Sequence, residues 1–160
     1  MDDAAVVAWQ LGRTPRGPWR TASRCSFGYP TTIVTVPVTG SGEPFPTLYY
    51  LTCPHLVAAV GRLESDGLME VLRAELASDG SLTARLLDAD ESYRKARACE
   101  GGGVDPQPNV GIAGQRDPCA VKCLHAHTAA LLAGIADPLG EVVLQKLTAE
   151  CADRRCEEAT

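Results

Sequence analysis

The densest group of soft metal ligands in the chain is the segment DPCAVKCLHAH at residues 117–127. It holds two of the seven cysteines and two of the three histidines. Thiolates and imidazoles are ligands that zinc prefers, usually four of them in a tetrahedron. A cysteine beside a histidine can also act as a nucleophile beside its base. The segment therefore indicates a metal site or a reactive thiol.

Two short patterns in the chain have the same form, CPH at Cys53 to His55 and CLH at Cys123 to His125. Each places a thiol and an imidazole two residues apart near an expected helix start. The exposed N–H groups at a helix start lower the pKa of a thiol. Paired C-x-x-C knuckles, which mark a zinc ribbon, do not occur in the sequence.

The start of the helix in this segment decides which side chains can share an ion. If the helix begins before Cys119, Cys123 and His125 point about 200° apart at about 100° per residue. In that case Cys119, Cys123 and His127 form one stripe. If the helix instead begins near Leu124, Cys123 and His125 can converge. Both alternatives fit the sequence.

The first third of the chain predicts an arm followed by a hairpin. Residues 1–24 are rich in arginine, glycine and proline, which predicts an irregular basic arm. The β-branched residues 31–38 predict a strand, and residues 47–52 predict a second strand joined to the first as a hairpin. Because a lone hairpin is marginally stable, helices must cover one of its faces.

The rest of the chain predicts helices. Helical periodicity begins at Pro54, resumes at Leu68, and begins again after Asp79, which can cap a helix. The glycine- and proline-rich residues 100–118 predict a long loop. An Asp-Pro pair at Asp137 predicts the start of the last helix, as the similar pair at residue 117 does for the helix before it.

These elements predict an α+β fold that is mostly helical, with a small antiparallel hairpin. Residues 25–150 form the single expected domain, and residues 151–160 form a charged C-terminal tail. Cys99, Cys151 and Cys156 have no expected role.

The net charge and the short apolar runs argue against several classes of function. Fifteen basic against twenty acidic residues give a net charge of −5, which argues against nucleic acid as the main partner. The acidic start predicts no secretory signal, and no apolar run approaches the ~20 residues of a membrane span. We therefore expect a cytoplasmic protein with reduced cysteines and no membrane partner.

Four motifs of the chain, spread from about residue 11 to about residue 143, resemble a bacterial family, the domains of unknown function numbered 501. The motifs are RCSFGYP, PFPTLYYLTCPHL, VKCLHAH and DPLGEVV. The resemblance singles out the segment Pro44, Phe45, Pro46 and Thr47 and a set of three cysteines and one histidine, namely Cys25, Cys53, Cys123 and His125. It implies a grouping and no activity.

The predicted metal ligands are Cys25, Cys53, Cys123 and His125. Three thiolates and one imidazole satisfy a structural zinc ion, and they can also hold a [4Fe–4S] cluster. Participation of His55, His127 or Cys119 stays open. Two other functions compete with metal binding. One is a thiol enzyme or redox switch that uses Cys123, and the other is a non-catalytic module that binds another cytosolic protein and has structural cysteines.

Overall fold

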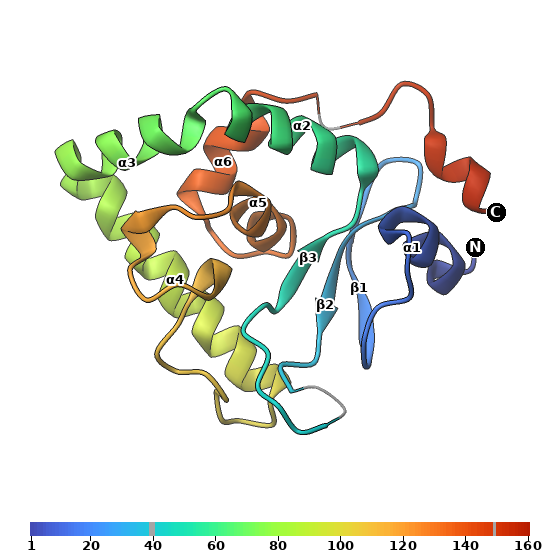
Figure 1. Cartoon of the computed structure of the whole chain (residues 1–160), viewed down its shortest axis with the longest axis horizontal. Helices are drawn as coiled ribbons and strands as arrows, with labels where there is room; N and C mark the ends of the chain where they lie inside the picture. Colours follow the sequence, from blue (N-terminus) through green and yellow to red (C-terminus); the bar gives the residue numbers. More distant parts are fainter. Residues whose placement is uncertain (39–40, 149) are drawn as a thin grey trace.

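The computed structural model describes residues 1–38, 41–148 and 150–160 of the chain. This described part contains six α-helices and a three-stranded sheet, and five of these helices share one apolar cluster with the last strand (Figure 1). The sheet is antiparallel throughout. The expected α+β class, mostly helical with a small antiparallel sheet, is confirmed.

The sheet contains the expected hairpin and one more strand. Its strands are β1 (Trp19–Arg24), β2 (Pro30–Thr35) and β3 (Tyr49–Leu51), in the order β1-β2-β3. The predicted hairpin corresponds to β2 and β3, with Ile33 opposite Tyr50. Every residue of β2 is buried, as expected for the central strand.

Residues 1–24 differ from the irregular arm that their composition predicts. They form helix α1 (Asp3–Leu11) and strand β1. The carboxylate of Asp2 caps α1 by accepting the N–H of Ala4 at 2.9 Å. Arg24 of β1 forms an ion pair with Asp3 at 2.6 Å. Pairing with β2 supplies the hydrogen bonds of β1, and a local sequence pattern does not show that pairing.

The helices follow the sheet and enclose a central helix. Their bounds are α2 (Pro54–Ser65), α3 (Leu68–Ser78), α4 (Gly80–Glu100), α5 (Leu124–Leu132) and α6 (Pro138–Gln145), with short 3-10 helices η1 (Ile112–Gly114), η2 (Pro118–Ala120) and η3 (Arg155–Ala159). In Figure 1, α5 lies end-on in the centre, between the sheet and the helices α2, α3, α4 and α6, whereas α1 lies on the other side of the sheet. It packs against α6, β3 and α2.

Helix α5 is fixed to α6 by buried polar contacts. One oxygen of Asp137 accepts the N–H groups of Leu139 at 2.9 Å and Gly140 at 3.0 Å, which confirms the predicted helix start. The other oxygen lies 2.7 Å from Nδ1 of His127, and both side chains are fully buried. A Cβ atom at Gly140 would lie 2.6 Å from the carbonyl oxygen of His127, so the two helices approach closely.

The long segment expected as a loop is held to the body of the protein. Arg97 of α4 is fully buried, and its guanidinium donates to Asp105 at 2.8 and 2.9 Å. It also donates to the carbonyl oxygens of Pro46 and Gln107. Asp90 accepts the N–H of Ile112 at 2.9 Å. These contacts order the segment around η1.

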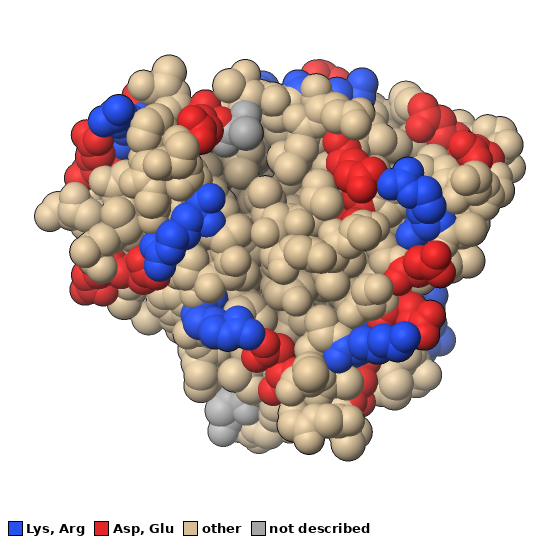
Figure 2. Space-filling model, turned by 180° about the vertical axis from the view of Figure 1, so that it is seen from behind, with Lys and Arg blue, Asp and Glu red and all other residues tan. Residues whose placement is uncertain are grey.

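The surface shown in Figure 2 carries basic and acidic side chains next to each other around a broad uncharged centre. Arginines of the predicted basic arm are also paired, Arg24 with Asp3 and Arg20 with Glu100. Among the helices that the structure describes, none is long and apolar enough to cross a membrane.

Candidate metal centre

A break in the chain before α5 brings Cys123 and His125 together. The 3-10 helix η2 ends at Ala120, and Val121 then takes a left-handed conformation with φ 44°. Cys123 is extended, with φ −153° and ψ 108°, and α5 begins at Leu124. Of the two alternatives that the sequence allows, the structure has the second, because no continuous helix runs from η2 into α5.

A third side chain, Glu64 of α2, completes a group with Cys123 and His125, which we call the α2–α5 group. One ligand atom from each residue lies within 4.8 Å of the others. Glu64 Oε1 accepts the N–H of Leu124 at 2.8 Å and lies 3.1 Å from His125 Nδ1. Among the described residues, this is the one set of three or more His, Cys, Asp or Glu with such close ligand atoms.

The histidine ring is oriented by its second nitrogen. His125 Nε2 lies 3.0 Å from the carbonyl oxygen of Val57. Because a carbonyl oxygen can only accept, Nε2 carries a hydrogen and Nδ1 faces Glu64 and Cys123. A histidine that binds a metal usually donates its other ring N–H to such an acceptor. The ring is therefore set for Nδ1 to act as a ligand.

The ionisation of the group fits this geometry. The hydrogen bond to Cys123, together with the Val57 carbonyl and Glu64, raises the pKa of His125 to about 9 against the effect of burial. Burial alone would raise the pKa of the Cys123 thiol. Hydrogen bonds from His125 and the Ala126 N–H outweigh burial, so the pKa is lowered. Without a metal, the group thus favours a protonated His125 and makes the Cys123 thiol easier to ionise.

A small hollow opens beside the α2–α5 group. Its volume is about 230 Å³, and its lining includes Cys123, His125, Tyr49, Tyr50 and Thr47. Thr47 ends the PFPT motif that the sequence singles out. Cys123 and His125 are half-buried, and both residues line this hollow.

The structure brings together two of the four predicted ligands. Cys123 and His125 belong to the α2–α5 group, whereas Cys25 and Cys53 do not. Cys53 precedes α2 as its N-cap residue. Cys25 begins the turn between β1 and β2, where its N–H donates to the carbonyl of Tyr29 at 2.9 Å.

The three residues that the sequence leaves open lie outside the α2–α5 group. His55 Nε2 is 2.7 Å from the carbonyl oxygen of Thr148, and His127 is bound to Asp137. Cys119 lies in η2, with its thiol hydrogen-bonded to Thr83. The His127 side chain is fully buried.

Glu64 was missed at the sequence level because nothing local distinguishes it. It is one acid among several on α2 and α3, and it stands far from Cys123 in the chain. A helix N-terminus attracts carboxylates, so an acid facing the start of α5 was to be expected. Only the packing of α2 against α5 identifies which acid it is.

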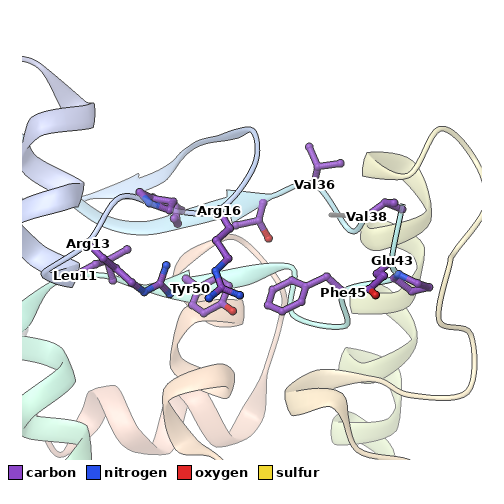
Figure 3. Close-up of a pocket in the computed structure, with 12 residues that line it drawn as sticks. Leu11, Arg13, Arg16, Val36, Val38, Glu43, Phe45 and Tyr50 are labelled. Atoms are coloured by element: carbon purple, nitrogen blue, oxygen red, sulfur yellow. The ribbon is translucent and has the colours of Figure 1, made fainter. Parts of the chain in front are cut away.

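A larger hollow lies elsewhere, on the side of the sheet near α1. Its volume is about 460 Å³, and Figure 3 shows Arg13 and Arg16 extending toward Tyr50 and Phe45. The two rings are stacked, with centroids 6.0 Å apart. Guanidinium groups beside aromatic rings suit anionic, planar molecules. Among the described residues, the lining has no thiol or imidazole, so this hollow does not include the α2–α5 group, although Tyr50 lines both hollows.

Comparison with known proteins gives a family and no activity. The model of a family described as protein of unknown function (DUF501) matches residues 21–145, which include Cys25, Cys53, Glu64, Cys123 and His125. No curated protein and no solved structure matches the chain significantly.

Proposed function

Because the chain belongs to the DUF501 family, whose description assigns no activity, we propose its function from the site: it binds one zinc ion through Glu64, Cys123 and His125. The observation that carries the proposal is the convergence of a thiol, an imidazole and a carboxylate within 4.8 Å. These are the three protein ligand types that zinc uses.

The surroundings of the three ligands support the proposal. The Val57 carbonyl holds His125 with Nδ1 toward Glu64 and Cys123. Backbone packing, rather than a flexible side chain, positions this acceptor oxygen. Little conformational entropy is therefore lost at this contact when zinc binds. Three protein ligands leave a fourth position of the tetrahedron for water or another molecule, as in catalytic zinc sites. The hollow lined by Tyr49 and Tyr50 gives that position access.

Ligand chemistry favours zinc over an iron–sulfur cluster in the α2–α5 group. Iron–sulfur clusters are held mainly by cysteine thiolates, four in the common forms. The group supplies one thiol only, with one imidazole and one carboxylate. A mixed set of this kind suits a single divalent ion of borderline softness.

Zinc titration of the chelator-treated, reduced full chain tests the proposal. We expect C123S and H125N each to weaken zinc binding at this site by at least about 100-fold, since loss of a partner behind a ligand already costs 10–100-fold. The matched control is C99S, which removes an exposed thiol of α4. Equal zinc affinity in the wild type, C99S, C123S and H125N would refute the proposal.

One observation favours a second function, a nucleophilic thiol. Cys123 is the N-cap residue of α5, and its sulfur lies within 4.8 Å of a ring nitrogen of His125 beside an open hollow. This arrangement is the one that activates cysteine nucleophiles. Alkylation of the zinc-free protein should then modify Cys123 faster than Cys99, with the difference lost in H125N. Similar alkylation rates at the two thiols would exclude this function.

A further inference from the structure

The C-terminal residues 148 and 150–160, which we call the tail segment, fold back over the start of the chain. In Figure 1 the segment runs past α2 and ends near α1, so the two termini lie close together. The contacts are specific. The Thr148 carbonyl meets His55, the Glu150 carboxylate accepts the N–H of Ser26, and Arg154 lies over the ring of Phe27.

The tail segment is polar, yet it buries two side chains. Among its described residues, 148 and 150–160, the buried ones are Cys151 and Cys156, which are 9% and 4% exposed. Its other described residues are exposed or half-buried. Burial of two small side chains is little apolar area to hold a charged segment in place.

Both buried cysteines lie toward the two cysteines of the body that the α2–α5 group does not use. The Cys156 side chain packs in a cluster with Cys25, and its thiol interacts electrostatically with those of Cys25 and Cys151. The thiol of Cys53 interacts in the same way with those of Cys151 and Cys156. The residues that flank the tail cysteines touch Ser26 and His55, close in sequence to Cys25 and Cys53.

The surroundings supply the contacts that thiolates need. Cys53 stands at the start of α2, where the N–H groups of the first turn favour a negative charge. Gln10 Nε2 donates to Cys156 Sγ at 3.3 Å. The guanidinium of Arg155 interacts with the thiols of Cys151 and Cys53, which offsets negative charge. Without a metal, burial raises the pKa of Cys53 and of Cys156, so both are then neutral thiols.

We propose that Cys25, Cys53, Cys151 and Cys156 form a second, four-thiolate metal centre that fastens the tail segment to the body. The four thiols lose their protons to the solvent as the metal binds. The centre is separate from the α2–α5 group and does not depend on it. It uses two of the cysteines that the sequence predicts as ligands and two that had no expected role.

Four cysteine thiolates are the usual ligand set of a [4Fe–4S] cluster. Sulfurs bound to one zinc ion lie within about 4.6 Å of one another, twice the Zn–S length of about 2.3 Å. In the described part of the chain, no three of the four sulfurs lie within 4.8 Å. Thiolates on a [4Fe–4S] cluster bind different iron atoms and so stand further apart.

Metal analysis of the full chain purified without oxygen tests this centre. We compare wild type, the double variant C151S/C156S and the single variant C25S, with C99S and C123S as controls that keep all four thiols. Each sample is also reconstituted with ferrous iron and sulfide under reductant, and separately with zinc. Far-UV circular dichroism verifies that each variant retains its helices.

We expect iron and sulfide, with the broad visible absorbance of a cluster, in the wild type, C99S and C123S. The two variants that lack thiols of the centre should lose at least nine tenths of this signal. If C25S and C151S/C156S instead bind less zinc than the wild type, the result supports the four-thiolate centre with zinc as its occupant. If the wild type and C151S/C156S hold equal metal of both kinds, the proposal is overturned. C123S removes a ligand of the proposed zinc site and keeps all four thiols of the second centre. A negative result for the four-thiolate centre therefore does not contradict the zinc site, and a negative result for the zinc site does not contradict the four-thiolate centre.

Discussion

The α2–α5 group and the four-cysteine group are built in different ways. Glu64, Cys123 and His125 stand on two packed helices, and their ligand atoms are already close together. Cys25 and Cys53 begin a turn and a helix, and their two partners come from a polar tail segment. The first group is therefore organised by the core, whereas in our proposal a bound metal fastens the parts of the second.

The largest effect should come from weakening the core beneath the α2–α5 group. D137A removes two backbone caps and leaves His127 without its buried partner. We expect a loss of about 3 kcal/mol in the free energy of unfolding, from an unpaired buried group and a lost cap together. Urea denaturation measures it.

D79A is the matched control for that variant. Asp79 also caps a helix through two N–H groups, but it is exposed. Its loss should cost only about 1 kcal/mol. Equal costs for D79A and D137A would show that the contact between α5 and α6 does not organise the site.

The next effect concerns Glu64, the proposed ligand that the sequence did not reveal. E64Q keeps the size of the side chain but removes its charge beside His125. We expect zinc affinity to fall by about 10–100-fold, and the four-cysteine group to keep its metal. E75Q, on the exposed face of α3, is the control. Unchanged zinc affinity in E64Q would remove Glu64 from the site.

The pH dependence of the α2–α5 group gives a smaller effect with a definite sign. The pKa of His125 is raised from 6.5 to about 9 in the folded, metal-free protein. The resulting stability is fully present below about pH 6.5 and is lost as pH rises through about 9. Zinc must displace the proton on Nδ1, so zinc affinity should increase with pH up to about 9.

Titration of the histidine ring by NMR tests this expectation. The midpoint for His125 in metal-free wild type should lie near 9, and in C123S it should be lower, because the bond to Cys123 is the main cause of the shift. The same midpoint in both proteins would contradict the pairing of Cys123 with His125.

The smallest effect is local to the tail segment. Without metal, trypsin should cut after the exposed Arg154 before it cuts the helices, because the segment buries only Cys151 and Cys156. In the iron- or zinc-loaded wild type this cut should be slowed, and in loaded C151S/C156S it should not. Equal cutting of loaded and metal-free wild type would mean that no metal fastens the segment.

Local signals in the sequence predicted the elements that depend on local chemistry. Asp137 followed by proline predicted the start of α6, and Asp79 that of α4, because a side-chain cap acts within a few residues. The strand β1 was missed because its hydrogen bonds come from β2. In the same way, the sequence allows α5 to begin before Cys119 or near Leu124, and the left-handed turn at Val121 separates these alternatives.

The site was predicted in part for a similar reason. Cys123 and His125 are near each other in sequence, so their convergence was one of two local alternatives. Glu64 reaches them through helix packing, which the sequence does not display. Cys151 and Cys156 stand in a segment whose charges suggest exposure, and only its return over α1 and α2 shows that they are buried.

X-ray absorption of the zinc-loaded C151S/C156S variant tests the central claim most directly, because this variant leaves the α2–α5 group as the zinc site. The account predicts one sulfur at about 2.3 Å with nitrogen and oxygen ligands at about 2.0–2.2 Å. A shell of four sulfurs, or a shell with no sulfur, would contradict zinc binding by Glu64, Cys123 and His125.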